Sequence, residues 1–287
     1  MTPPEPLAPA APAAPDPLRI DPDLVEGILS RFLVEEVTKV GFQRVVIGLS
    51  GGVDSALACW LAARALGPGQ VLAVCLPYRA SDPRSLEDAR QVVAVTGVPS
   101  RTLDISPQID AYFAAVPTDD RRRRGNKLAR ERMTVLYDLS LAESALVLGT
   151  SNKTELLLGY GTVFGDLASA LNPLGDLYKT QVFQLAAHAR LPPAVLAKAP
   201  SADLFRGQSD EADLGFSYAC ADRLLYHLVD ERRTVAECLE LGFAADLVAS
   251  VRQRIRHNQF KRRLPLIAKL SARTIDCDFR YPRDWGR

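Results

Sequence analysis

The chain has 287 residues, of which 47% are hydrophobic and 24% charged, so it is long enough to bury a substantial core. Its formal net charge of +1 excludes the strongly basic overall surface with which proteins attract nucleic acid or anionic membranes. The five cysteines are scattered and include no Cys-x-x-Cys pair, which argues against a disulfide framework and against a zinc site.

The first 19 residues are rich in proline and alanine and hold few large apolar side chains. We expect them to form a disordered tail ahead of one domain over residues 20–287. The start lacks the basic and apolar regions of a secretory signal, and no apolar run approaches the roughly 20 residues of a membrane span. We therefore expect a cytoplasmic protein with neither a membrane nor a nucleic acid as its partner.

Hydrophobic periodicity along the chain predicts alternating helices and strands. The first helix should begin at Asp21-Pro22, an N-cap followed by proline, and stop at Gly41. The helix that opens with the Ser-x-x-Asp box at Ser85 should follow the second strand. The long polar stretch 117–127 is expected to be a mobile loop. We expect strands over 44–49, 71–76, 101–105 and 145–148, and helices over 53–66, 85–96, 126–142, 153–158, 178–189 and 214–229.

This alternation of short apolar strands and amphipathic helices is typical of right-handed βαβ units. The predicted fold class is α/β, with a doubly wound, mainly parallel sheet that forms a nucleotide-binding core to about residue 175. The strand pattern then fades, and we expect a small helical C-terminal part. Ligands of such sheets bind at the carboxyl ends of the strands, so the motifs that follow strands matter most.

The segment Ser50-Gly51-Gly52-Val53-Asp54-Ser55 joins the first predicted strand to its helix. Its glycines permit a tight turn and a close approach of the backbone to phosphate, and the helix N-terminus directs amides at an anion. The two serines add hydroxyl donors. Asp54 makes sense beside a polyphosphate only as a ligand of Mg²⁺. The alternative, a turn of small residues without a ligand, explains neither the serines nor the aspartate.

The same segment resembles the signature of the ATP-pyrophosphatase (PP-loop) family, whose members transfer AMP to an oxygen before a nitrogen or sulfur nucleophile displaces it. That resemblance implies an adenine nucleotide alpha hydrolase-like fold. Further segments resemble, in the same order, the NAD synthetase family, from about residue 25 to the C-terminus. They are Cys75-Leu76-Pro77-Tyr78, 125–133, 148–166, 172–180 and 200–204.

The resemblance to NAD synthetases implies roles for the residues that match the family's motifs. It implies a phosphate contact by Lys179 that would stabilise charge on the leaving pyrophosphate. It also implies deamido-NAD contacts at Arg132, Phe260 and Lys261, Mg²⁺ held by Asp54 and Glu155, and a homodimer. The implied ATP contacts are Gly48, Ser50, Gly51, Gly52, Val53, Asp54, Ser55, Thr150, Lys179 and Ser201.

Some of these residues have plainer interpretations when each is taken alone. Glu155 would then be a solvated glutamate of a first helical turn, and Lys179 a surface lysine. Arg130 could belong to a solvated helix face or could bind a ligand, and the sequence does not decide between the two. The basic run 121–124 is typical of a solvated loop. The chain also departs from the ammonia-using branch of the family, which has a lysine at the position of Val163 and an aspartate at that of Ala170.

The implied reaction joins deamido-NAD, ATP and ammonia to give NAD, AMP and pyrophosphate through an adenylated carboxylate. We expect free ammonia, or ammonia from a separate subunit, because a glutaminase needs an activated cysteine in a domain of some 200 residues. A tRNA thiolase would require paired cysteines or a strongly basic surface. A nucleotide sensor without turnover would have no evident need for both Asp54 and Glu155.

Overall fold

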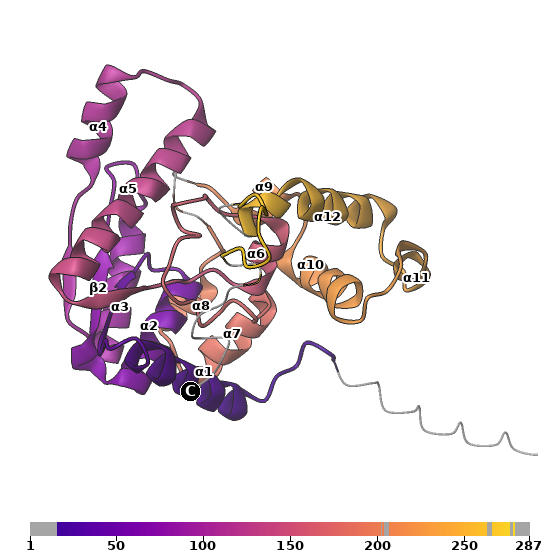
Figure 1. Ribbon diagram of the computed structural model, residues 1–287, viewed down its shortest axis with the longest axis horizontal. Helices are drawn as coiled ribbons and strands as arrows, with labels where there is room; N and C mark the ends of the chain where they lie inside the picture. Colours follow the sequence, from indigo (N-terminus) through magenta and orange to yellow (C-terminus); the bar gives the residue numbers. More distant parts are fainter. Residues whose placement is uncertain (1–15, 202, 204–206, 263–265, 276–277, 279–287) are drawn as a thin grey trace, which may run out of the picture.

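Four parallel strands form the centre of the computed structural model, which describes residues 16–201, 203, 207–262, 266–275 and 278 (Figure 1). Because β4 pairs with β1 on the side opposite β2, the direction of winding reverses between β1 and β4. A parallel α/β sheet binds its ligands at such a switch point. The strands are β1 Arg44–Gly48, β2 Val71–Cys75, β3 Ser100–Thr102 and β4 Ala145–Leu148, and their spatial order is β3-β2-β1-β4.

Helices cover both faces of this sheet, which confirms the doubly wound fold predicted from the sequence. Val45 and Ile47 of β1 are buried in one hydrophobic cluster, and Val46 between them is buried in another. The strands are therefore continuous apolar runs rather than alternating ones. The first cluster lies under α1 Pro22–Thr38, α2 Val53–Leu66, α3 Pro83–Thr96, α7 Lys179–His188 and α8 Pro193–Ala197, and the second lies under α4 Ser106–Ala115 and α5 Arg121–Ala142.

Several elements have the bounds that the sequence predicted. α2, β4 and α6 Lys153–Leu158 match without change, and α7 differs from the predicted helix by one residue at each end. Asp21 caps α1 as expected, because its carboxylate accepts a hydrogen bond from the Leu24 backbone N–H (3.2 Å). Local turn and capping signals were therefore sufficient to place these elements.

The second and third βα units differ from their predictions. α3 begins two residues before Ser85, because Asp82 is its N-cap and accepts a hydrogen bond from the Arg84 backbone N–H (3.0 Å). The strand predicted over 101–105 is the shorter β3, and the chain turns from it into α4, which the periodicity did not reveal.

The mobile loop predicted over 117–127 is wrong for residues 121–127, which are helical. α5 begins at Arg121, because the Asp120 carboxylate accepts hydrogen bonds from the backbone N–H groups of Arg122 (2.8 Å) and Arg123 (3.2 Å). An aspartate cap therefore starts the helix within the run of arginines, and the carboxylate also lies at the positive end of the helix dipole.

The small helical C-terminal part is present and packs against α6 (Figure 1). The helix predicted over 214–229 begins later, because α9 ends at Leu214 and α10 continues into a π-helical turn over 226–230. Asn258 Nδ2 donates a hydrogen bond to the Leu158 carbonyl (3.0 Å), which brings the last helical turn to the end of α6. The elements are α9 Asp210–Leu214, α10 Tyr218–Leu225, α11 Val235–Glu240, α12 Ala245–His257 and a 3-10 helix Gln259–Arg262.

Part of the predicted N-terminal tail belongs to the packed domain. Leu18 is 3% exposed, and its carbonyl accepts a hydrogen bond from Gln184 Nε2 (2.9 Å). The domain therefore begins before the predicted boundary at residue 20, whereas residues 1–15 lie outside the described part of the chain. Among the described residues, no helix combines the length and the apolar character needed to cross a membrane.

Candidate active site

A cleft of about 1370 Å³ opens at the carboxyl ends of the strands, beside the switch point between β1 and β4. Its lining comes from the 50–55 loop after β1, from the loop between β2 and α3, from the start of α6, from residues 198–201, 203, 207–210 and 212–213, and from the C-terminal Lys261. Small-molecule pockets typically enclose roughly 300–1,000 Å³. This cleft therefore has room for more than one ligand.

The 50–55 loop is braced by its own serine side chains. Ser55 Oγ donates a hydrogen bond to the Gly52 carbonyl (3.1 Å) and accepts one from the Ser50 backbone N–H (3.2 Å), and the two serine hydroxyls lie 3.1 Å apart. These bonds fix the entry into α2, whose first-turn amides have no partner within the helix. The loop therefore presents amides to the cleft, as an anion site requires.

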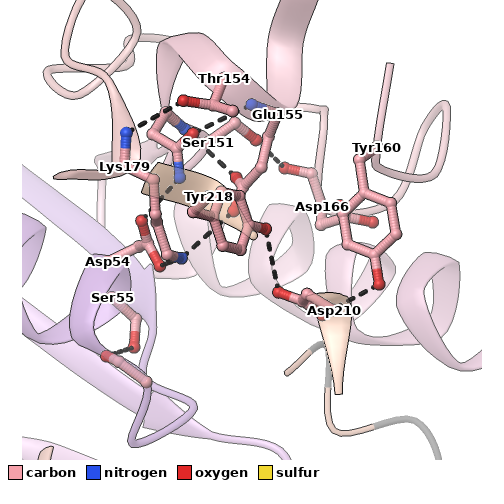
Figure 2. Close-up of polar contacts among 12 residues, drawn as sticks. Asp54, Ser55, Ser151, Thr154, Glu155, Tyr160, Asp166, Lys179, Asp210 and Tyr218 are labelled. Atoms are coloured by element: carbon pink, nitrogen blue, oxygen red, sulfur yellow. Dashed lines mark hydrogen bonds and ion pairs between the residues drawn. The ribbon is translucent and has the colours of Figure 1, made fainter. Parts of the chain in front are cut away.

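A buried lysine lies between two carboxylates next to this loop (Figure 2). Lys179 is 2% exposed, and its Nζ lies 2.5 Å from Asp54 Oδ2 and 3.4 Å from Glu155 Oε1. The ammonium also lies 5.1 Å from the centroid of the Tyr218 ring, within cation–π range. Asp54, Glu155 and Lys179 belong to the first turns of α2, α6 and α7, so three helix N-termini meet here.

The charges of this cluster shift the titration of its members. Burial works to lower the pKa of Lys179, but Asp54 and Glu155 raise it above its ordinary value, so the ammonium stays charged. Burial raises the pKa of Glu155, which Lys179 opposes and Asp54 reinforces. Lys179 is therefore the cation that offsets the charge of the two carboxylates.

Asn152 holds both carboxylates from the other side. Its side chain caps α6, since Oδ1 accepts a hydrogen bond from the Glu155 backbone N–H (3.0 Å), and its Nδ2 donates to Asp54 Oδ1 (2.9 Å). The Asn152 backbone N–H in turn donates to Glu155 Oε2 (3.2 Å). Asn152 lies within the 148–166 segment, and the sequence alone assigned it no role.

Asp222 of α10 fixes α6 and α7 relative to each other. It is fully buried and accepts hydrogen bonds from the Thr154 hydroxyl (2.6 Å) and the Thr180 backbone N–H (2.7 Å). Thr154 Oγ1 also accepts a hydrogen bond from the Lys179 backbone N–H (3.0 Å). The helical C-terminal part therefore sets the position of Lys179 through a residue that touches neither its ammonium nor the cleft.

Figure 2 shows a third carboxylate, Asp210, joined by hydrogen bonds to Tyr160 and Tyr218. Tyr160 donates a hydrogen bond to Asp210 Oδ1 (2.9 Å) and Tyr218 donates to Oδ2 (3.2 Å). Burial raises the pKa of Asp210, and Lys179 opposes this shift. These contacts attach α9 to the Lys179 cluster and add negative charge to this end of the cleft.

Arg132 and Lys261 also line the cleft. Arg132 donates through Nε to the Leu76 carbonyl (3.1 Å) and through Nη2 to Ser81 Oγ (3.3 Å). Lys261 Nζ donates to the backbone carbonyls of residues 159 (2.7 Å) and 161 (2.9 Å). A guanidinium has five N–H donors and an ammonium three, so both groups retain donors for an anionic ligand.

Most residues predicted to form the site line this cleft. Gly51 instead packs against α3, and Phe260 is 53% exposed and lies outside the cleft lining, as do Val163 and Ala170. Arg122, which the sequence analysis placed in a solvated loop, lines the cleft from the first turn of α5. The predicted residues that line the cleft are Gly48, Ser50, Gly52, Val53, Asp54, Ser55, Arg132, Thr150, Glu155, Lys179, Ser201 and Lys261.

The sequence analysis missed Asn152, Tyr160, Asp210 and Tyr218. The pattern Asn-x-x-Glu at residues 152–155 is a capping-box signal that could have identified Asn152. No local pattern marks the other three, because their contacts join distant parts of the chain, such as Tyr160 and Asp210, which are 50 positions apart.

Asp54 and Glu155 fit a magnesium ion by the chemistry of their oxygen donors and by their place beside the anion-binding loop. A cationic group, the Lys179 ammonium, already lies between them. In the described part of the chain, no group of three or more His, Cys, Asp or Glu side chains is suited to hold a metal. Mg²⁺ commonly takes one or two protein carboxylates together with phosphate oxygens and water, so this pair suits a metal that arrives with a nucleotide.

The parallel sheet, the serine-braced anion loop and the carboxylate pair define a nucleotide-binding α/β protein. Comparison with known sequences then specifies which one. The family model described as NAD synthase matches residues 26–265, and the chain belongs to this family.

Individual relatives and solved structures agree with this assignment. A protein named NH(3)-dependent NAD(+) synthetase from Trichlorobacter lovleyi is 56% identical over 270 residues, which are 94% of this chain and 99% of that protein. One of the same name from Chlorobium phaeobacteroides is 53% identical over 268 residues, covering 93% and 97%. The NH3-dependent NAD synthetase structure from Campylobacter jejuni has a TM-score of 0.76 at 35% identity, covering 88% of this chain and 100% of that one. The structure of NMN synthetase from Francisella tularensis has a TM-score of 0.79 at 30% identity, with the same coverage.

Proposed function

We propose that this protein is an ammonia-dependent NAD synthetase, which amidates deamido-NAD to NAD and converts ATP to AMP and pyrophosphate. The observation that carries this proposal is the cluster of Asp54, Lys179 and Glu155 beside the 50–55 loop, in a member of the NAD synthase family. A carboxylate is anionic and has no good leaving group, so ammonia does not attack it directly. Transfer of AMP to the nicotinate carboxylate supplies the leaving group, and the protein positions the reactants and offsets their charge.

The phosphates of ATP are proposed to lie between the 50–55 loop and Lys179. The braced loop and the N-termini of α2 and α7 offer amides and positive dipole ends to them. Gly48, Thr150 and Ser201 line the same cleft and are proposed to contact the nucleotide. Asp54 and Glu155 would hold Mg²⁺, which when bound offsets negative charge on the phosphates.

Deamido-NAD is proposed to lie in the part of the cleft that Arg132 and Lys261 line. It carries a pyrophosphate and a nicotinate carboxylate, and a guanidinium recognises both kinds of group through paired hydrogen bonds. Arg132 and Lys261 retain donors there, and Phe260, at the surface next to Lys261, is proposed to contact the ligand at the rim. Because Val163 and Ala170 lie outside the cleft lining, these other groups would hold the dinucleotide.

The reaction is tested with α-labelled ATP, Mg²⁺, ammonium and deamido-NAD. We expect AMP and NAD to form in equal amounts, and AMP only when deamido-NAD is present. Substituting glutamine for ammonium should reduce the rate to background, because the proposed donor is free ammonia. AMP release at the same rate with and without deamido-NAD, or no AMP release at all, would contradict the proposal.

A second candidate substrate is nicotinate mononucleotide, whose amidation would give NMN. The likeness to the solved NMN synthetase of Francisella tularensis favours it. The relatives that are more than 50% identical are named for NAD, which favours the dinucleotide. The same assay with the mononucleotide in place of deamido-NAD separates the two, since kcat/KM should be higher for the true substrate.

We also propose that the protein acts in the cytoplasm as a homodimer. The second half of α5 leaves Tyr137 44% and Leu141 85% exposed, an apolar surface suited to a second copy of the chain. Light scattering should then give a mass twice the 31.3 kDa of the chain. A mass of one chain at the concentrations used for the activity assay would contradict the dimer.

A further inference from the structure

Lys179 occupies an unfavourable place for a lysine. It is 2% exposed, and it is the first residue of α7, where the positive end of the helix dipole repels a cation. What stabilises its charge is the pair of carboxylates at 2.5 and 3.4 Å. The ammonium is therefore held in this place by Asp54 and Glu155.

All four oxygens of these two carboxylates have partners within the chain. Asn152 donates a hydrogen bond to one oxygen of each carboxylate: its Nδ2 donates to Asp54 Oδ1, and its backbone N–H donates to Glu155 Oε2. Lys179 Nζ donates to the other oxygen of each carboxylate, Asp54 Oδ2 and Glu155 Oε1. Each of these oxygens keeps a further lone pair, but a metal ion between Asp54 and Glu155 would have to take the place of the ammonium that now bridges them.

We propose that Lys179 is a built-in counter-ion that excludes free divalent cations from Asp54 and Glu155 until the phosphates of a nucleotide draw its ammonium away. The proposal rests on the proposed function only in naming Mg²⁺ and ATP as the ligands. A metal that arrives alone must displace the ammonium and leave it buried without a partner, which is unfavourable. A metal that arrives with ATP brings phosphate oxygens to which the ammonium can turn. Metal and nucleotide should thus bind cooperatively, with no separate regulatory site.

The test measures Mn²⁺, a paramagnetic probe for the Mg²⁺ site, binding to the nucleotide-free protein by electron paramagnetic resonance. Replacing Lys179 with methionine keeps the aliphatic stem and removes the charge. We expect K179M to bind Mn²⁺ at least about tenfold more tightly than the wild type, because the two carboxylates then lack their cation. Thermal unfolding of K179M should also shift upward with Mn²⁺ more than that of the wild type.

Lys198 offers a matched control. It also lines the cleft, and its Nζ lies 2.9 Å from Asp88 Oδ2. Among the ion pairs of the described residues, Lys198 has this one carboxylate partner, whereas Lys179 has two. K198M should leave Mn²⁺ affinity unchanged. The double variant K179M/D54N should lose the gain seen in K179M, which would assign the new site to Asp54.

A measurement on the wild type keeps the test decisive if K179M does not fold. Without nucleotide, the wild type should bind Mn²⁺ no more tightly than D54N, because Lys179 closes the site. Tighter binding by the wild type, or equal affinities for the wild type and a folded K179M, would overturn the proposal. Neither ATP nor deamido-NAD is present in these measurements, so their outcome is independent of whether the protein amidates deamido-NAD.

Discussion

Replacing Asp54 with asparagine is expected to lower the rate of AMP formation from ATP by about 10²- to 10³-fold, the loss typical when one preorganised charge-stabilising group is removed. The asparagine keeps the shape of the side chain, and its oxygen can still accept the 2.9 Å hydrogen bond from Asn152. It removes the charge that holds Lys179 at 2.5 Å and the proposed metal ligand. We expect the free energy of unfolding to fall as well, because the buried ammonium then keeps Glu155 but loses Asp54 as a counter-ion, so the rate is measured on folded protein.

The same change at Asp230 controls for the loss of a lysine–aspartate pair. Asp230 accepts from Lys153 at 2.8 Å, is 33% exposed and does not line the cleft. We expect D230N to retain the rate within about twofold, because Asp230 lies outside the cleft and the asparagine oxygen can still accept one of the hydrogen bonds that Lys153 and Tyr178 donate to Asp230. Single-turnover assays at saturating ATP and Mg²⁺ make the comparison. If D54N kept more than a tenth of the wild-type rate, the proposed role of Asp54 in ATP cleavage would be contradicted.

The parts of the fold that the sequence predicted are those determined by local signals. β1 is a β-branched run bounded by glycine, and α2 begins directly after Gly52 and ends at Gly67, so their limits can be read from a few neighbouring residues. The same holds for the 50–55 loop. Its backbone conformation and its serine contacts span at most five positions along the chain.

The start of α5 shows how a local charge rule failed. The arginine run 121–124 is typical of a solvated loop, yet Arg124 lies over the Phe113 ring at 4.5 Å and reaches the Tyr78 hydroxyl at 3.5 Å. These partners belong to α4 and to the loop after β2, and no pattern near residue 124 reveals them. Packing of the guanidinium stem and its cation–π contact override the preference of a charged run for water.

The contacts inside the candidate site could not be predicted from neighbouring residues either, because they join residues that are distant in the chain. A lone lysine is normally a surface residue, and the burial of Lys179 depends on Asp54, 125 residues away in the chain. Asp222 acts on Thr154 across 68 residues. A resemblance to a family could assign Lys179 a ligand, but only the fold reveals that its ammonium is already paired with the carboxylates proposed to bind metal.

Replacing Gly51 with alanine is expected to destabilise the protein by about 3 kcal/mol and to weaken ATP binding at least about tenfold. The backbone of Gly51 has φ +74°, and a Cβ there would lie 2.2 Å from the Ser85 carbonyl oxygen and 3.0 Å from Asp88 Cβ. A carbonyl oxygen of α3 cannot rotate away as a side chain could. The loop must therefore move, and the amides at the start of α2 move with it. Urea unfolding without ligands and the KM for ATP measure the two effects.

Gly97 separates the clash from the backbone strain. It has φ +69°, nearly that of Gly51, but a Cβ there would meet nothing within 4 Å. G97A should therefore cost only the left-handed strain of about 1–2 kcal/mol and leave the KM for ATP unchanged. If G51A and G97A were equally stable and bound ATP equally well, the approach of the 50–55 loop to α3 would have no part in shaping the site. A selective loss in G51A would instead support the dependence of the nucleotide loop on α3 as well as on its own serines, because the two glycines have nearly the same φ and only Gly51 has the contact with α3.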